Sequence, residues 1–224
     1  MDFDLSHYDI SYYVKKKKEY EQGKPWKIEP FFFGLDVRDR TVLDYGSAAG
    51  NMAREAVKRQ AKSVVAYDPI YDSHPELVNL IQSDGVDFVT TKHLESIHDK
   101  FDLIFCSDVI EHVVPYEIEF FIANLIKFSH QQSVICINSP VKINFAYCIG
   151  RPMASTTQGH INVMNPWHVN RLFKKVGFAL IAHPIVLGVS KKPLLRKLGD
   201  LPYPLNSVWG GHYFMRFAAK TDAG

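Results

Sequence analysis

The chain has 224 residues, of which 46% are hydrophobic, and its 26 lysine and arginine residues nearly balance 24 aspartate and glutamate residues. This length fits one domain with at most a small cap, and the apolar content excludes a chain that is disordered throughout. The net charge of +2 does not indicate a polyanionic partner, and the six basic and two acidic residues of 190–224 are typical of a solvated loop.

The cysteines and the hydropathy pattern indicate a cytoplasmic protein. The sequence has three cysteines, Cys106, Cys136 and Cys148. An odd number without a CxxC pair predicts neither a disulfide scaffold nor a zinc site. No run reaches the roughly 18 consecutive apolar residues that a membrane helix needs. The first ten residues are acidic and aromatic, unlike a signal peptide. We therefore predict a reducing compartment and no membrane span.

The first predicted element lies in a distinct leader. Residues 11–22 have helical character, and Gly23 and Pro25 end the stretch before the run Phe31–Phe33. The leader helix is expected to pack on the main domain, to cover a pocket as a lid, or both. The predicted organisation is a helical cap at 1–33 followed by a single domain at 34–224.

From residue 40 onward, β-rich runs alternate with segments of helical spacing. The predicted strands are 41–45, 63–67, 86–90, 101–106, 133–138, 178–186 and 213–219. The predicted helices are 52–60, 75–81, 116–128 and 166–176, the last with Asn165 as N-cap and Gly177 after its end. Helices between the first five strands predict a parallel sheet covered on both faces, and the last two strands form an antiparallel hairpin at one edge. The expected fold is α/β, a doubly wound seven-stranded mixed sheet.

The most informative stretch is Val42–Asn51, a strand followed by a small-residue loop and the start of a helix. Gly46 and Gly50 permit a ligand to approach the backbone closely, and helix-start amides favour an anionic group such as a carboxylate. The glycines are spaced G-x-x-x-G, which differs from the dinucleotide pattern G-x-G-x-x-G. Asp44 would repel a pyrophosphate and attract an ammonium group. The loop therefore suits a ligand with an amino-acid end and a nucleoside end.

A second acidic residue, Asp68, ends the second predicted strand about 20 residues after the glycine loop. A carboxylate at this place can accept hydrogen bonds from both hydroxyls of a ribose. By itself an Asp-Pro pair is a common turn, but after the Asp44–Gly50 loop it predicts a nucleoside site.

At these residues the sequence resembles the class I S-adenosylmethionine-dependent methyltransferases, over roughly Phe31 to Lys220. Four stretches carry the resemblance: the first motif, the ribose-binding acid, the fourth-strand motif and the helix before strand six. They read VLDYGSAAG, YDP, FDLIFCSDVIEHV and NPWHVNRLFKKVGF. The sequence is most similar to the small-molecule O-methyltransferase branch, which includes ubiquinone-biosynthesis and sugar enzymes and often carries Glu-His-Val after strand four.

The resemblance implies a Rossmann-like fold and S-adenosyl-L-methionine as cofactor. It implies cofactor contacts at Asp44, Gly46, Ser47, Gly50, Asp68 and Ser107. Many members place an acid against the adenine amine after strand three, whereas residues 90–94 here contain none. We expect adenine to be bound by backbone and apolar contacts.

Candidate acid–base residues follow the fourth and fifth strands. Asp108, Glu111 and His112 have the spacing i, i+3 and i+4, which places them on one face if the turn is helical. His160 follows strand five and is within reach of the same pocket. Three interpretations remain open: His112 or His160 is a general base; all four residues bind a divalent metal, as in small-RNA 3′-terminal 2′-O-methyltransferases; or Glu111-His112 is structural and proximity suffices.

We predict that His112 and His160 are catalytic and that a small molecule is methylated on oxygen; no residue is assigned as a metal ligand, and the metal interpretation stays open. Cys106–Val109 stands where nucleobase amino-methyltransferases carry an Asn/Asp-Pro-Pro-aromatic loop, so a nucleic-acid acceptor is not favoured. The leader and residues 141–165 and 190–212 are expected to determine specificity. Alternatives are a metal-dependent RNA 2′-O-methyltransferase and a non-catalytic regulatory protein that binds the cofactor.

Overall fold

The computed structural model describes residues 9–23, 28–82, 85, 87–140, 160–187 and 212–220. Cys148 and most of the two later segments expected to determine specificity, 141–159 and 188–211, lie outside the described residues.

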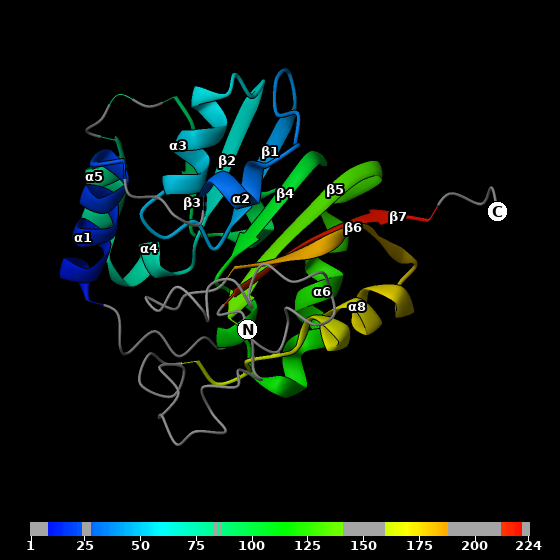
Figure 1. Cartoon of the computed structure of the whole chain (residues 1–224). Helices are drawn as coiled ribbons and strands as arrows, with labels where there is room; N and C mark the ends of the chain where they lie inside the picture. The colour runs from blue at the N-terminus through cyan, green and yellow to red at the C-terminus, as the bar shows by residue number, and fades with distance from the viewer. Residues whose placement is uncertain are drawn as a thin grey trace, which may run out of the picture.

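Seven strands form one mixed sheet in the order β3-β2-β1-β4-β5-β7-β6 (Figure 1). The strands are β1 (Thr41–Tyr45), β2 (Ser63–Tyr67), β3 (Val89–Thr91), β4 (Phe101–Ser107), β5 (Ser129–Pro140), β6 (Phe178–Leu187) and β7 (His212–Ala219). The first five pair in parallel, and β7 runs antiparallel between β5 and β6. The predicted seven-stranded mixed sheet is confirmed. Its strand order reverses between β1 and β4, where ligands bind in open α/β sheets.

Helices cover both faces of the sheet (Figure 1). One face packs against α2 (Ile28–Phe32) and α3 (Asn51–Lys58), and the other packs against α6 (Ile118–Lys127) and α8 (Pro166–Lys175). Along β1 the side chains alternate: Val42 belongs to the first core, and Leu43 belongs to the second. A strand buried on both sides reads as a continuous apolar run, which explains the pattern of β1 and β4.

A third cluster attaches the leader helix to the glycine loop. Tyr13 of α1 (Ile10–Glu21) is buried with Ala49 of the loop and with residues of α4 (Ile70–Ser73) and α5 (Pro75–Gln82). Figure 1 shows α1 alongside α5 at this end of the molecule. The side-chain amide of Asn51 also donates a hydrogen bond to the carbonyl of Lys16, at 3.2 Å. The leader helix therefore packs directly on the loop that follows β1.

Several predicted boundaries differ from the structure. β3 begins at Val89, β5 begins at Ser129, and α6 begins at Ile118 after a 3-10 turn at Pro115–Glu117. The largest difference lies after β4. The segment there is a single 3-10 turn, Ile110–His112, and Asp108 before it has a φ of 56°. The shared face of Asp108, Glu111 and His112 was predicted on the condition that this turn is helical, and that condition is not met, because a left-handed residue cannot be part of an α-helix.

Candidate active site

The loop after β1 is tied to the end of β2. The backbone N–H groups of Gly46 and Ser47 both donate to the carbonyl of Tyr67, at 2.8 and 3.0 Å. Gly50 donates to the carbonyl of Ser47 and then serves as the N-cap residue of α3. The two predicted parts of the cofactor site, at the ends of β1 and β2, are thus joined by backbone hydrogen bonds.

Asp44 lies beneath this loop and is 1% exposed. Its Oδ2 accepts a hydrogen bond from the backbone N–H of Ala53, at 3.0 Å, which attaches α3 to β1. Burial raises the pKa of Asp44 to about 7; the Ala53 hydrogen bond opposes this shift, and the nearby charge of Asp68 adds to it. The carboxylate is buried, and its negative charge is readily stabilised by a cation.

Asp68 lies on the other side of the loop. Its Oδ2 accepts from the backbone N–H of Ala48 at 2.7 Å, and its Oδ1 accepts from that of Ile70 at 3.0 Å. Burial raises the pKa of Asp68 to about 6, against the effect of these two hydrogen bonds. Asp68 therefore holds the glycine loop to the start of α4, in addition to any contact with a ligand.

Ser47 is positioned by Tyr71, which sequence reasoning missed. The Tyr71 hydroxyl donates to the carbonyl of Ala48 at 3.0 Å and lies 2.7 Å from the Ser47 Oγ. Tyr71 sits on the short helix α4 and is buried in the cluster with Tyr13. No local signal marks it, because its role depends on the contact between α4 and the loop.

Ser107 and Asp108 at the end of β4 are held by Asn138 of β5. The Asn138 amide donates to the Ser107 Oγ at 3.0 Å and to the Asp108 Oδ1 at 3.3 Å, and the Asn138 carbonyl accepts from the Asp108 N–H at 2.9 Å. Asn138 is fully buried and was not predicted as a site residue. It organises the turn that leads from β4 toward Glu111 and His112.

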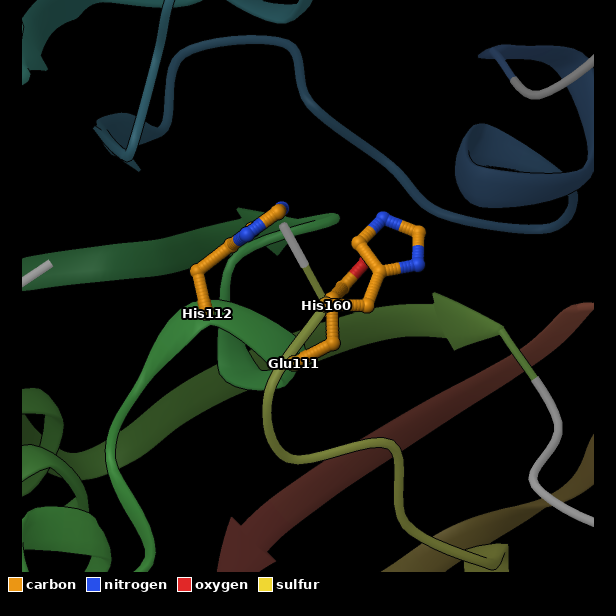
Figure 2. Close-up of side chains that lie close together, drawn as sticks. All are labelled: Glu111, His112 and His160. Carbon is orange, nitrogen blue, oxygen red and sulfur yellow. The ribbon is translucent and has the colours of Figure 1, made fainter. Parts of the chain in front are cut away.

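Three of the predicted acid–base residues gather after β4. Figure 2 shows Glu111 and His112 on the turn that follows β4, with His160 facing them from the segment that leads to α8. One ligand atom from each of the three lies within 4.8 Å of the others, and the imidazole rings of His112 and His160 are 4.9 Å apart in an edge-to-face arrangement. Asp108 is outside this group of three.

The segment carrying His160 is attached through the backbone of Glu111. The Glu111 carbonyl accepts from the N–H groups of Ile161 and Asn162, at 3.0 and 2.8 Å. Glu111 is fully buried, and His112 is 7% exposed. A buried carboxylate beside two imidazoles can accept a proton or bind a divalent cation.

The glycine loop and the turn after β4 are in direct contact. Gly46 has a φ of 81°, and a Cβ built on it would lie 2.2 Å from the Val109 Cγ2. Val109 comes directly before the 3-10 turn that carries Glu111 and His112. The structure therefore brings the loop with the predicted cofactor residues into contact with the turn that carries Glu111 and His112, at the carboxyl ends of β1 and β4.

The leader helix carries two adjacent tyrosines, Tyr12 and Tyr13. Tyr13 is buried against Ala49 and attaches the leader to the glycine loop. The pKa of Tyr12 is raised to about 12, first by partial burial and then by the charges of Asp108, Glu19 and Glu111.

The two buried carboxylates predict how stability depends on pH. Their pKa values in the folded protein, about 7 for Asp44 and about 6 for Asp68, exceed the value near 4 of an unfolded chain. Between about pH 4 and 7 the folded state holds more protons, so these groups lower the free energy of unfolding as pH rises, by at most about 1.4 kcal/mol per pH unit each.

Asp44→Asn is therefore expected to flatten this dependence in the protein without cofactor, measured by urea unfolding from pH 4.5 to 7.5. Asp102→Asn is the matched control, because the pKa of Asp102 is lowered and its titration lies below this range. An Asp44→Asn profile parallel to that of the unsubstituted protein would contradict the expectation.

A sequence model described as a methyltransferase domain matches residues 18–183. Comparison with curated protein sequences gives no significant match. Among the residues that the structure describes, no helix is both long and apolar enough to span a bilayer.

Several solved structures share the fold. The N-methyltransferase NodS from Bradyrhizobium japonicum WM9 aligns with a TM-score of 0.60 and 14% identity, over 92% of this chain and 99% of that one. The magnesium protoporphyrin IX methyltransferase from Synechocystis PCC 6803, with bound S-adenosylhomocysteine, aligns with a TM-score of 0.59 and 13% identity, over 92% of this chain and 84% of that one. The 1,6-didemethyltoxoflavin-N1-methyltransferase from Burkholderia thailandensis, with bound 1,6-didemethyltoxoflavin and S-adenosylhomocysteine, aligns with a TM-score of 0.56 and 13% identity, over 93% of this chain and 87% of that one.

At this level of identity the structures establish the fold, and the sequence model establishes the family. The chain belongs to the methyltransferase-domain family and is a class I methyltransferase that uses S-adenosyl-L-methionine.

Proposed function

We propose that the protein transfers the methyl group to an oxygen atom of a small organic acceptor, in the cytoplasm. The observation that carries this proposal is the grouping of Glu111, His112 and His160 at the turn after β4, whose Val109 packs against Gly46 of the glycine loop. An oxygen nucleophile benefits from a proton acceptor beside the methyl donor, and imidazole serves at neutral pH. The free, buried thiols of Cys106 and Cys136 support a reducing compartment.

The residues at the ends of β1 and β2 suit the cofactor. Asp44 and Asp68 offer carboxylates to the ammonium and to the ribose hydroxyls, and Gly46 and Gly50 keep side chains out of the loop. Ser47 and Ser107 offer hydroxyl groups on the two sides of the same site. The cofactor, when bound, supplies an electrophilic methyl group on a positively charged sulfur.

On the acceptor side, we propose that His112 and His160 bind the acceptor hydroxyl and take up its proton. Their rings lie edge to face, and backbone hydrogen bonds from Ile161 and Asn162 to Glu111 attach the segment after His160 to the turn that carries His112. The buried Glu111 carboxylate beside them stabilises an imidazolium ion by charge attraction. We propose that the predicted cap closes this space through its helix α1, which packs on the glycine loop.

A divalent cation is a second candidate for the same three residues. One carboxylate and two imidazoles within 4.8 Å of one another form a ligand set that leaves coordination positions open. The donor set therefore fits a metal, which would lower the pKa of a coordinated hydroxyl. In this case Glu111, His112 and His160 would be the metal ligands. The acceptors would then include the 2′-hydroxyl of an RNA end as well as small hydroxylated molecules.

A small acceptor remains the favoured class. The Burkholderia N1-methyltransferase with a similar fold binds the small molecule 1,6-didemethyltoxoflavin. A nucleic-acid acceptor would need a basic surface, and the net charge of +2 gives little support for one.

The proposal predicts S-adenosylhomocysteine binding by calorimetry and transfer of labelled methyl groups to a hydroxylated compound. A suitable panel contains phenols, catechols, sugar nucleotides, the matching amines and a short RNA with a free 3′ end. Transfer to a phenol or sugar that persists in EDTA supports the general-base form. Transfer that EDTA abolishes and Mg²⁺ or Mn²⁺ restores supports the metal form.

Two results would contradict the proposal at different levels. Methylation of the amines alone would refute the oxygen acceptor. Intact cofactor binding with no transfer to any compound in the panel would favour the regulatory alternative.

A further inference from the structure

The hydroxyl of Tyr71 makes two hydrogen bonds to the glycine loop from outside it. Tyr71 lies on α4 and is 3% exposed. Its hydroxyl donates to the carbonyl of Ala48 at 3.0 Å and lies 2.7 Å from the Ser47 Oγ. The Asp68 carboxylate accepts from the N–H of the same Ala48, at 2.7 Å. Both backbone polar groups of Ala48 are therefore held by residues of the segment that follows β2.

Ala48 has a backbone conformation that needs such support. Its φ of 47° lies in the left-handed region, which is unfavourable for a residue with a Cβ. Conformations of this kind persist where the surrounding structure imposes them, and they cluster at functional sites. The hydrogen bond to Asp68 fixes the peptide between Ser47 and Ala48, and the hydrogen bond from Tyr71 fixes the next peptide. The backbone that presents the Ser47 side chain is thus set from both directions.

The two contacts of Tyr71 also determine which hydroxyl donates to the other. A phenol has one proton to donate, and a carbonyl oxygen can only accept. Because the Tyr71 proton goes to the Ala48 carbonyl, the Ser47 hydroxyl is the donor in the 2.7 Å contact. Burial raises the pKa of Tyr71 well above its ordinary value of 10, and the charge of Asp68 adds to this shift, so the phenol keeps its proton at neutral pH.

The oxygen of Ser47 is left as a hydrogen-bond acceptor, because its own proton is engaged by Tyr71. A hydroxyl in this state can accept from an ammonium group and cannot donate to a carboxylate. The buried carboxylate of Asp44 lies beneath the same loop and favours the same positive charge. The amino-acid end of the methyl donor carries an ammonium group, which matches both acceptors.

We propose that Tyr71 is a positioning residue for the cofactor, which holds the Ser47 hydroxyl as an acceptor for the cofactor's ammonium group. This inference rests on the proposed contact of Ser47 with the cofactor. Tyr71 itself touches neither the cofactor nor the acceptor. It acts through Ser47, and its effect should disappear when the Ser47 hydroxyl is absent.

A double-substitution cycle with S-adenosylhomocysteine tests this dependence by calorimetry. Tyr71→Phe should raise the Kd about fivefold, and Ser47→Ala should raise it about tenfold or more, the scale of a lost hydrogen bond to a charged group. The variant with both substitutions should bind within about twofold of Ser47→Ala alone. Independent effects would multiply, to about 50-fold or more, and that result overturns the proposal.

A ligand without the amino-acid end separates positioning from a general loosening of the loop. 5′-Methylthioadenosine has the nucleoside and the thioether of S-adenosylhomocysteine and no ammonium group. Tyr71→Phe should leave its Kd within about twofold, since the variant keeps the Asp68 hydrogen bond to the loop. If 5′-methylthioadenosine loses as much affinity as S-adenosylhomocysteine, Tyr71 only stabilises the loop, and the proposal fails.

Ser133→Ala is the matched control for the loss of a buried hydroxyl. The Ser133 Oγ donates to the carbonyl of Phe101 at 2.6 Å and accepts from the N–H of His130 at 2.7 Å. It therefore bridges two groups as the Tyr71 hydroxyl does, but at the amino end of β4. Ser133→Ala should lower the free energy of unfolding and leave the Kd for S-adenosylhomocysteine unchanged. An increase in Kd equal to that of Tyr71→Phe would attribute both effects to lost stability and refute the positioning role.

These measurements contain no methyl acceptor, so their outcome does not depend on O-methylation. If Ser47→Ala binds S-adenosylhomocysteine like the unsubstituted protein, the proposed Ser47 contact is refuted, and the role of Tyr71 is refuted with it. If Ser47→Ala binds weakly and the two substitutions multiply, the Ser47 contact stands and only the role of Tyr71 is refuted.

Discussion

Gly46→Ala is expected to lower the free energy of unfolding by about 2–5 kcal/mol and to abolish measurable cofactor binding. Two costs add at this position. An L-residue at a φ of 81° costs about 1–2 kcal/mol, and the new Cβ, 2.2 Å from the Val109 Cγ2, must displace the turn after β4 at an overpacking cost of about 1–3 kcal/mol. The displaced turn carries Glu111 and His112, so the acceptor side would shift together with the loop.

Urea unfolding and calorimetry with S-adenosylhomocysteine measure the two effects. Gly177→Ala is the matched control, because Gly177 has nearly the same φ of 82° and no atom within 4 Å of a built Cβ. Gly177→Ala should lower the free energy of unfolding only by the conformational cost, about 1–2 kcal/mol, and leave the affinity for S-adenosylhomocysteine unchanged. Equal destabilisation by the two substitutions would show that the contact with Val109 is unimportant.

Asp68→Ala is expected to weaken cofactor binding by about 1–3 kcal/mol, which is roughly a 5- to 150-fold increase in Kd. The substitution removes the acceptor proposed for the ribose hydroxyls. It also releases the N–H groups of Ala48 and Ile70 and so loosens the glycine loop. Stability should fall as well, because two backbone donors lose a buried carboxylate partner.

Asp102→Ala controls for the loss of stability. Asp102 accepts two hydrogen bonds from the backbone and hydroxyl of Thr41, at the start of β1 and far along the strand from the glycine loop. Its removal should destabilise the protein and leave the Kd for S-adenosylhomocysteine unchanged. If Asp68→Ala binds S-adenosylhomocysteine normally, Asp68 is not a cofactor residue, and the proposed ribose contact must be abandoned.

The residues around the glycine loop were predictable because their signals are local. The apolar run of β1, the small residues 46–50 and the acid that ends β2 follow from strand and turn preferences within a few positions. Beside the proposed cofactor contacts, the structure gives each carboxylate a structural role, since Asp44 accepts from the N–H of Ala53 and Asp68 accepts from that of Ala48. That role depends on hydrogen-bond geometry, which composition and spacing do not encode.

The turn after β4 shows why a local pattern failed. The spacing of Asp108, Glu111 and His112 favours a helical face, but Asp108 has a left-handed conformation and exchanges hydrogen bonds with Asn138, 30 residues later: its N–H donates to the Asn138 carbonyl, and its carboxylate accepts from the Asn138 amide. Helix propensity over five residues is worth less than these tertiary contacts. The consequence is chemical, because Asp108 turns to His212 while Glu111 and His112 turn to His160.

The sequence by itself determined the alternation of strands and helices, the mixed sheet and the loop at the end of β1, because hydrophobic periodicity and glycine placement act over short distances. Only the tertiary structure decided which side chains share the site. Tyr71, Asn138 and His212 come from separate elements, and the strand order β1-β4-β5-β7 brings the last two beside Ser107 and Asp108. Residues far apart in the chain meet only where hydrogen-bonded strands place them, and that pairing is fixed by the packing of the whole sheet.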